Sequence, residues 1–229
     1  MILTIAAALA AAAPAASACP AVVTPDALVC RALEAQKAGD AEAAARSFEQ
    51  AALAGSDKDP VTARMWAAAG NMWIAAGQAG KAALALDRAL AGTRLQGEQR
   101  GEALLDRARA AEAQNDLRTA RARLNEAGAT IAGDPFYWYF SAALAIREGD
   151  KAAAQGAIGR ALTLAPSDPT ILFEAGHVAH FAGDDDKARG YWMRAAAGDP
   201  NGATGKAAAK AIEMLGVTPI VKGPAQPTR

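Results

Sequence analysis

Residues 134–169 have the sequence DPFYWYFSAALAIREGDKAAAQGAIGRALTLAPSDP, and the pattern that they carry recurs along most of the chain. Asp134 is a natural N-cap, and Pro135 suits the first position of a helix because the amide that proline lacks would be unpaired there. Gly149 and the aspartate after it interrupt the helical period, which then resumes until Pro166. The stretch therefore predicts two amphipathic helices joined by a sharp turn.

This helix–turn–helix pattern returns at a nearly constant interval. The turn at Gly149 has a counterpart 34 residues later, at Gly183. Earlier counterparts, at intervals of 34 or 38 residues, lie at Gly39, Gly77 and Asn115. A single helix pair cannot bury both of its apolar faces, so each pair needs neighbours. A repeat of this length and content predicts an elongated solenoid that forms one domain.

The core positions of these repeats resemble those of the tetratricopeptide repeat family. In that family the first helix carries a large residue and small residues, the second carries two alanines around a larger apolar residue, and a proline closes the repeat. The positions that match this pattern are Trp66, Gly70, Trp73, Ala82, Leu86 and Ala89 in one repeat and Trp138, Ala142, Ala154, Ile158, Ala161 and Pro166 in another. The resemblance implies an all-α fold, a right-handed α-solenoid of about five repeats with a C-terminal capping helix.

The resemblance also predicts the bounds of the units. Repeats are expected at about residues 25–55, 61–92, 99–131, 135–165 and 169–198, within a repeat domain that spans 19–202. A single helix over 203–216, ended by Gly216, is expected to cover the last open face, since a solenoid needs a polar cap for solubility. Residues 217–229 contain three prolines and no amphipathic period, so we expect a disordered tail there.

Composition and motifs argue against several classes of function. Lys and Arg together number 24, as do Asp and Glu, so the chain has no net charge and lacks the basic surplus of a protein that coats nucleic acid. We therefore expect no nucleic-acid partner. The sequence contains no glycine-rich phosphate loop and no nucleophile-elbow motif, and it predicts a non-enzymatic protein without cofactors.

Residues 1–18, MILTIAAALAAAAPAASA, predict a bacterial secretory signal peptide. They form an apolar run that ends in small residues, with Ala-x-Ala patterns at 13–15 and 16–18. The run is too short for a comfortable transmembrane span. One feature departs from the usual pattern, since no Lys or Arg precedes the run and Asp26 is the first charged residue. We expect an exported protein, periplasmic or secreted.

Cys19 and Cys30 are the only cysteines, and two interpretations stay open. In an oxidising compartment such a pair usually forms a disulfide, and closing so short a loop would contribute roughly 3 kcal/mol. Alternatively, Ala16-Ser17-Ala18-Cys19 resembles a lipobox, which would make Cys19 the lipidated first residue of a lipoprotein. Contact with a membrane is expected only in that case. A metal site is disfavoured, because two cysteines fall short of four ligands.

The family resemblance implies a concave surface that holds an extended peptide or a partner's helix, lined by the first helices of successive repeats. By position, this surface would include Arg64, Asn71, Arg109, Glu112, Phe136, Tyr139, Arg147, Phe173, His177, His180 and Phe181. Aromatic and arginine side chains are the usual anchors of recognition surfaces. We expect Tyr139, Phe173 and Phe181 to be apolar anchors. Arg109 and Arg147 are expected to pair with acidic groups of the partner.

Parts of this surface have other interpretations. The aromatic rings could instead pack between repeats, which is our expectation for Trp138 and Trp192. His177 and His180 lie three apart on one helical face and could bind a metal with help from Glu174. Two imidazoles supply only half of a metal site, however, and we expect no metal there.

Repeat arrays serve many tasks, so several functions remain compatible with this sequence. We expect a non-enzymatic scaffold or adaptor that binds a protein or peptide on the concave surface, in the bacterial cell envelope. An alternative is a structural or assembly component of an envelope complex, anchored through Cys19 if that residue is lipidated. A third hypothesis is a metal- or small-molecule-binding protein centred on His177 and His180.

Overall fold

The computed structural model describes residues 19–56 and 58–217, and these residues form eleven helices and no strand. The predicted signal peptide, residues 1–18, lies outside the described residues, as do residues 218–229 of the predicted tail. The helices are α1 (Pro25–Lys37), α2 (Ala41–Ala54), α3 (Pro60–Ala75), α4 (Ala79–Leu90), α5 (Gly97–Ala113), α6 (Leu117–Ile131), α7 (Pro135–Glu148), α8 (Lys151–Leu164), α9 (Pro169–Ala182), α10 (Asp185–Gly198) and α11 (Ala203–Val217). No helix within the described ranges is both long and apolar enough to span a membrane.

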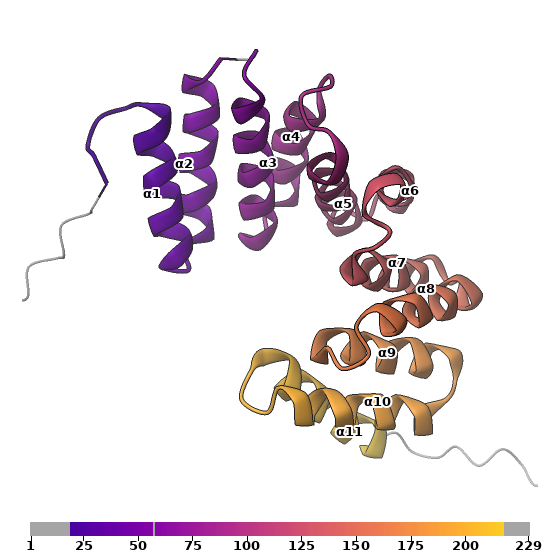
Figure 1. The fold of residues 1–229 in the computed structure, drawn as a ribbon. Coiled ribbons are helices and arrows are strands. Elements are labelled where there is room, and N and C mark those ends of the chain that lie inside the picture. The colour runs from indigo at the N-terminus through magenta and orange to yellow at the C-terminus, as the bar shows by residue number, and fades with distance from the viewer. Residues whose placement is uncertain (1–18, 57, 218–229) are drawn as a thin grey trace, which may run out of the picture.

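The helices form a curved stack of pairs. Each odd-numbered helix from α1 to α9 packs against a neighbouring even-numbered helix, and α3, α5, α7 and α9 also contact one another in order. Figure 1 shows these odd-numbered helices along the inner side of the curve, with α6 and α8 on its outer side. The first helices of successive pairs therefore form a continuous inner surface. The prediction of an all-α helical-repeat solenoid is confirmed.

The tight turns inside the pairs have a left-handed residue at each position expected from the sequence period. Gly39, Gly77, Gly149 and Gly183 have φ values of 80, 70, 78 and 92°. Asn115, at φ 61°, is the only non-glycine residue with positive φ among the described residues. Glycine adopts this conformation without steric cost, and asparagine is a tolerated substitute. The five turns therefore share a left-handed backbone conformation at the equivalent residue.

Helix starts follow the capping chemistry of the Asp-Pro pairs. The carboxylate of Asp134 accepts a hydrogen bond from the N–H of Phe136 at 2.8 Å, and Asp59 accepts one from Val61 at 2.8 Å. A proline fills the first helical position after each of these caps, where it sacrifices no helical hydrogen bond. Pro60 belongs to α3 for this reason, so the second repeat begins one residue before the predicted start at 61.

Small residues let the two helices of a pair approach closely. A Cβ atom on Gly70 would lie 2.4 Å from Leu86 Cγ, and one on Gly176 would lie 2.1 Å from Trp192 Nε1. Trp192 is 3% exposed, and its indole N–H donates to the carbonyl of Phe173 at 3.0 Å. The core is therefore a series of thin clusters between neighbouring helices instead of one thick centre.

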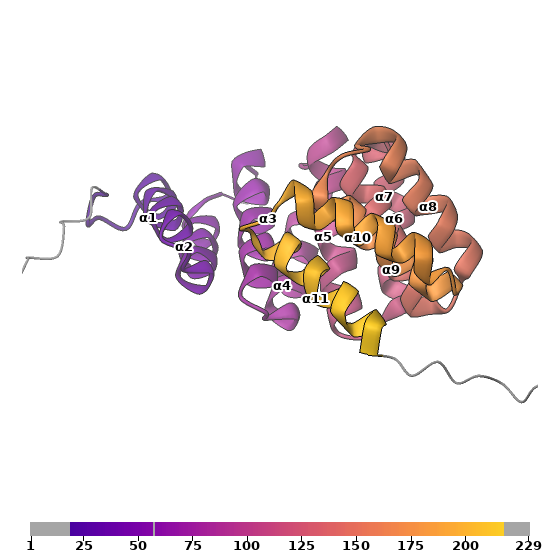
Figure 2. The same ribbon diagram turned by 90° about the horizontal axis from the view of Figure 1, so that it is seen from below.

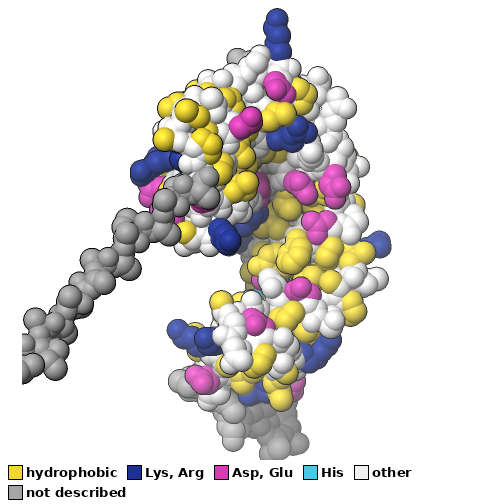
Figure 3. Space-filling model, turned by 60° about the vertical axis from the view of Figure 1, so that its left-hand side comes forward, with side chains coloured by type: hydrophobic (Ala, Val, Ile, Leu, Met, Phe, Trp, Pro, Cys, Tyr) yellow, Lys and Arg dark blue, Asp and Glu magenta, His cyan; other side chains and the backbone are white. Residues whose placement is uncertain are grey.

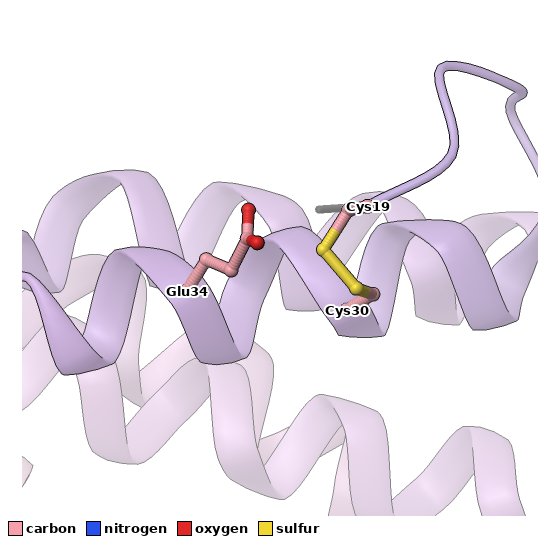
Figure 4. A group of neighbouring side chains, drawn as sticks. All are labelled: Cys19, Cys30 and Glu34. Carbon is pink, nitrogen blue, oxygen red and sulfur yellow. A yellow bond between two sulfur atoms is a disulfide. The ribbon is translucent and has the colours of Figure 1, made fainter. Parts of the chain in front are cut away.

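The residues before α1 fold back along it. A disulfide joins Cys19 to Cys30, with the two Cα atoms 5.7 Å apart, and Figure 4 shows the bond between the preceding segment and the helix. Arg31 donates to the carbonyls of Pro20 at 3.0 Å and Val22 at 3.1 Å. A sulfur in a disulfide cannot also carry a lipid, so the disulfide form and the lipidated form exclude each other.

α11 covers the C-terminal end of the stack. It packs against α9 and α10 through apolar residues that include Ala208, Ala211 and Ile212, and Figure 2 shows it beside α10. The helix is described through Val217, one residue beyond the predicted bound at Gly216. A single glycine costs about 1 kcal/mol relative to alanine inside a helix, which is too little to end it.

Candidate partner-binding surface

Two hollows lie along the inner side of the curve. The α3–α5 hollow, of about 460 Å³, is lined by residues that include Arg64, Asn71, Glu102 and Asp106. The α7–α9 hollow, of about 550 Å³, is lined by Glu112, Ala143, Ile146, Arg147, Glu174, His177, His180 and Phe181. Figure 3 shows the molecule hollowed between its two ends, with hydrophobic, acidic and basic side chains around the hollow. Of the nine predicted partner-binding residues, the three that line neither hollow are Arg109, Tyr139 and Phe173.

The α3–α5 hollow is lined by two acids, Glu102 and Asp106, and by one arginine, Arg64. Asp106 accepts hydrogen bonds from Asn71 Nδ2 and from Arg109 Nη1, both at 2.8 Å, and so joins α3 to α5. Burial, followed by the charges of Glu98 and Asp106, raises the pKa of Glu102. The polar group of Asn71 is thus bound within the chain, and the two carboxylates make this hollow better suited to a basic group than to a carboxylate.

Arg147 lines the α7–α9 hollow and links α7 to α5. Its guanidinium forms an ion pair with Glu112 and donates to Asn115 Oδ1 at 3.0 Å. Its side chain is partly exposed, and exposed ion pairs contribute at most about 1 kcal/mol. A partner's carboxylate could therefore replace Glu112 at little cost.

The predicted aromatic anchors occupy different environments. Tyr139 is half-buried and packs against the core clusters on both sides of α7, and burial, followed by the charge of Glu174, raises the pKa of its hydroxyl. Phe173 packs into the cluster between α9 and α10 and makes an edge contact with His177 at 4.5 Å between ring centroids. The structure thus places the ring of Tyr139 between repeats and the ring of Phe173 against the helix pair of the last repeat. Phe181 is the predicted anchor that lines the α7–α9 hollow.

The two histidines differ in exposure and in their contacts. His177 is half-buried, and burial lowers the pKa of its ring, with the neighbouring His180 adding to the effect. Its ring lies 5.3 Å from that of Trp192 between centroids, and the residue lines the α7–α9 hollow. His180 is exposed, and its Nδ1 lies 2.6 Å from Asp185 Oδ1.

One group of potential metal ligands occurs in the described part of the chain. The sulfurs of Cys19 and Cys30 and a carboxylate oxygen of Glu34 lie within 4.8 Å of one another (Figure 4). Both sulfurs belong to the disulfide, which lacks the thiolates that bind metals. Within the ranges 19–56 and 58–217, no group of three such ligands includes His177 or His180.

Glu174 is the residue of this surface whose burial sequence reasoning missed. It is 8% exposed, and this burial raises the pKa of its carboxyl to about 7. It lies on α9 three residues after Ile171 and four before Val178, both of which are buried. An acid at these spacings lies on the apolar face of the helix, so the sequence pattern could have predicted that Glu174 is buried.

Comparisons with known proteins agree with this architecture. No protein-family model and no curated protein matches the chain. Among solved structures, PilW, a widely conserved type IV pilus biogenesis factor, is 18% identical with a TM-score of 0.65, over 80% of this chain and 81% of its own.

Two further structures are described as TPR proteins. TTC0263 from Thermus thermophilus is 16% identical with a TM-score of 0.68, over 83% of this chain and 100% of its own. YrrB, with an unusual peptide-binding site, is 17% identical with a TM-score of 0.55, over 80% of this chain and 91% of its own. Similarity at these identities is evidence of shape alone. On that evidence the chain has the fold of a tetratricopeptide-repeat protein.

Proposed function

We propose that this chain is a non-enzymatic scaffold that binds a protein or peptide partner on its inner surface, in the bacterial cell envelope. The observation that carries the binding role is the pair of hollows along α3, α5, α7 and α9, which contact one another in order. Concave sites with a few polar groups among apolar walls are typical of ligand-binding surfaces. The peptide-binding site for which YrrB is described supports a peptide partner here.

Binding on this surface combines apolar contact with the exchange of ion pairs. Phe181 and Ile146 offer apolar surface in the α7–α9 hollow. Arg147 can leave Glu112 for a partner's carboxylate, because the existing pair is partly exposed and weak. Tyr139 packs between repeats and so helps to fix the shape of the surface before the partner arrives. A preformed surface loses little conformational entropy on binding.

The envelope location has two supports in the chain itself. Residues 1–18 carry the pattern of a secretory signal peptide. The disulfide between Cys19 and Cys30 fits an oxidising compartment, where such bonds persist. PilW, which has a similar fold, is described as a pilus biogenesis factor, and this supports a role in envelope assembly.

The test is capture of a partner from native envelope extract by the purified protein and two double variants. Arg147→Ala with Phe181→Ala removes two side chains of the α7–α9 hollow. Arg189→Ala with Met193→Ala removes an arginine and a large apolar side chain that are exposed on α10, and it serves as the matched control.

A partner should be retained by the wild type and the control and lost by the first variant. Anchor residues of this kind contribute at least about 2 kcal/mol, which is about 30-fold in Kd. Circular dichroism would establish that both variants fold. Equal capture by a folded Arg147/Phe181 variant would contradict the assignment of this surface.

A second candidate function is that of a self-assembling structural component. It is favoured by an apolar hollow of about 730 Å³ over α1 and α3, lined by residues that include Val29, Leu33, Phe48 and Val61. Leu33 is 53% exposed there, and large exposed apolar patches commonly mark association sites. Sedimentation should then show an oligomer that Leu33→Ser dissociates. A single-chain mass at every concentration would exclude this function.

A further inference from the structure

Glu174 is a buried acid that forms no hydrogen bond or ion pair in the described part of the chain, and its charge acts on the hydroxyl of Tyr139. No hydrogen-bond donor or cation of residues 19–56 or 58–217 contacts its carboxylate, although the side chain lies on a face with Ile171 and Val178. It lines the α7–α9 hollow together with Ala143 and Ile146 of α7. A buried carboxylate without a partner is costly, because it loses its hydration and gains nothing in return.

Most of the other charged groups beside this hollow have a partner of opposite charge, whereas the ammonium of Lys151 lies over the ring of Phe181. The titratable and charged groups that line the hollow beside Glu174 are Glu112 of α5, Arg147 of α7, and His177 and His180 of α9. Those that interact with Glu174 or with a lining residue are Tyr139 of α7, Lys151 of α8 and Asp185 of α10, and Arg109 of α5 acts on Tyr139. Arg147 is paired with Glu112, and Arg109 with Asp106. Ionised Glu174 is therefore the one charge on the wall of the hollow that the described chain leaves uncompensated.

The hollow also has room and apolar surface for the stem of a long basic side chain. Lysine and arginine bury their methylene stems against apolar walls while the charged head finds a counter-ion. Ile146 and Phe181 supply such walls, and the ring of Phe181 already accepts the ammonium of Lys151 at 5.5 Å from its centroid. The neighbouring α3–α5 hollow carries Glu102 and so continues the acidic character along the inner surface.

We propose that the α7–α9 hollow is a subsite for a lysine or arginine side chain of the bound peptide, with Glu174 as its counter-ion. This inference rests on the proposed function, because it names the chemistry of the partner on the same surface. The charge of the incoming head group compensates the buried carboxylate, so the acid that is costly in the free protein becomes favourable in the complex.

Binding should also release protons. Burial raises the pKa of Glu174 to about 7, so about half of the free protein carries a proton on this group at pH 7. A cation in contact with the carboxylate lowers that pKa, and the proton leaves as the peptide binds. Affinity should therefore increase as the pH rises from 6 to 8.

The experiment selects phage-displayed random dodecapeptides on the purified protein. We expect lysine or arginine to be enriched at one position. A selected peptide is then synthesised with its lysine replaced by norleucine or its arginine by citrulline. These changes should weaken binding to the wild type at least tenfold and should have little effect on binding to Glu174→Gln. Glu213→Gln, which changes an exposed acid on α11, is the matched control and should behave like the wild type.

Calorimetry of the selected peptide in phosphate and in Tris buffer measures the proton release directly. At pH 7 the wild type should release about half a proton per peptide bound, and Glu174→Gln none. Selected peptides without a basic preference, or basic peptides that Glu174→Gln binds equally well, would overturn the subsite and leave the proposed function standing. Failure to select any peptide would count against both.

Discussion

Replacing Glu174 with glutamine should make the stability of this protein less dependent on pH. Burial raises the pKa of Glu174 from 4.5 to about 7, so the folded protein keeps a proton that the unfolded chain releases at lower pH. The stability contributed by that proton is fully present below about pH 4.5 and is lost as the pH rises through about 7. Glutamine has the same shape and stays neutral, so the variant avoids this loss.

The size of the effect follows from the two pKa values. At 1.36 kcal/mol for each pKa unit, the wild type should lose about 3 kcal/mol of unfolding free energy between pH 4.5 and pH 8 relative to the variant. Glu174 is only 8% exposed, so solvent screens this effect little. For a chain of this length, the Tm of Glu174→Gln at pH 8 should therefore be higher than that of the wild type by roughly 6 to 12 °C.

Thermal unfolding followed by circular dichroism at pH 4.5 and pH 8 is the measurement. The wild type is compared with Glu174→Gln and with Glu213→Gln, which changes an exposed acid on α11. The other carboxylates titrate in all three proteins, so their effects on Tm cancel when each variant is compared with the wild type at the same pH. Hydrogen exchange at the amides of α9 reports the same change locally if the stack does not unfold as one unit. A difference between wild type and Glu174→Gln that is equal at both pH values would refute the reasoning.

Three further changes test the packing, the caps and the disulfide. Gly176→Ala should destabilise the protein by about 1–3 kcal/mol in urea unfolding, because its Cβ would lie 2.1 Å from the indole nitrogen of buried Trp192. Gln78→Asp should raise stability by about 0.5–1 kcal/mol, because Gln78 is an N-cap whose side chain makes no capping hydrogen bond. The intact mass of the exported protein should be two hydrogens lower than that of the reduced chain, and reduction of Cys19–Cys30 should cost roughly 3 kcal/mol.

Each of these has an outcome that would contradict it. For the glycine, the matched control is Gly190→Ala on α10, which has open space around it and should not destabilise. Equal stability of the two alanine variants would mean that the indole can move away. An unchanged urea midpoint in Gln78→Asp would argue against the cap geometry of α4. A lipid adduct on Cys19 would exclude the disulfide form.

Much of the fold could be predicted from the sequence because it depends on near neighbours along the chain. The turn at Gly149 and the start at Pro135 follow from the backbone preferences of glycine and proline. Asn115 could be placed in the third turn because it stands at the glycine position of the repeat and tolerates positive φ. α11 includes Gly216 because a single glycine weakens a helix without forbidding it.

The candidate surface could be predicted only in part. The period of the repeats places Arg147 and Phe181 on first helices, and both line the α7–α9 hollow. The period of the repeats also predicted that Phe173 would lie on the inner surface as an anchor. Its ring instead packs into the cluster between α9 and α10. Repeat position specifies which helix faces inward, yet the angle between neighbouring repeats decides which side chains of that helix reach the hollow.

Local sequence was sufficient for the helix pairs, the turns and the caps, since each depends on residues within a few positions of one another. The burial of Glu174 and the pairing of Asn71 with Asp106 required the folded chain. Both arise where helices of successive repeats meet: Asp106 is 35 positions from Asn71, and the α7 residues beside Glu174 in the hollow are 27 to 31 positions from it. Amphipathic periodicity describes one helix at a time, whereas the shape and charge of the hollows come from how those helices pack against each other.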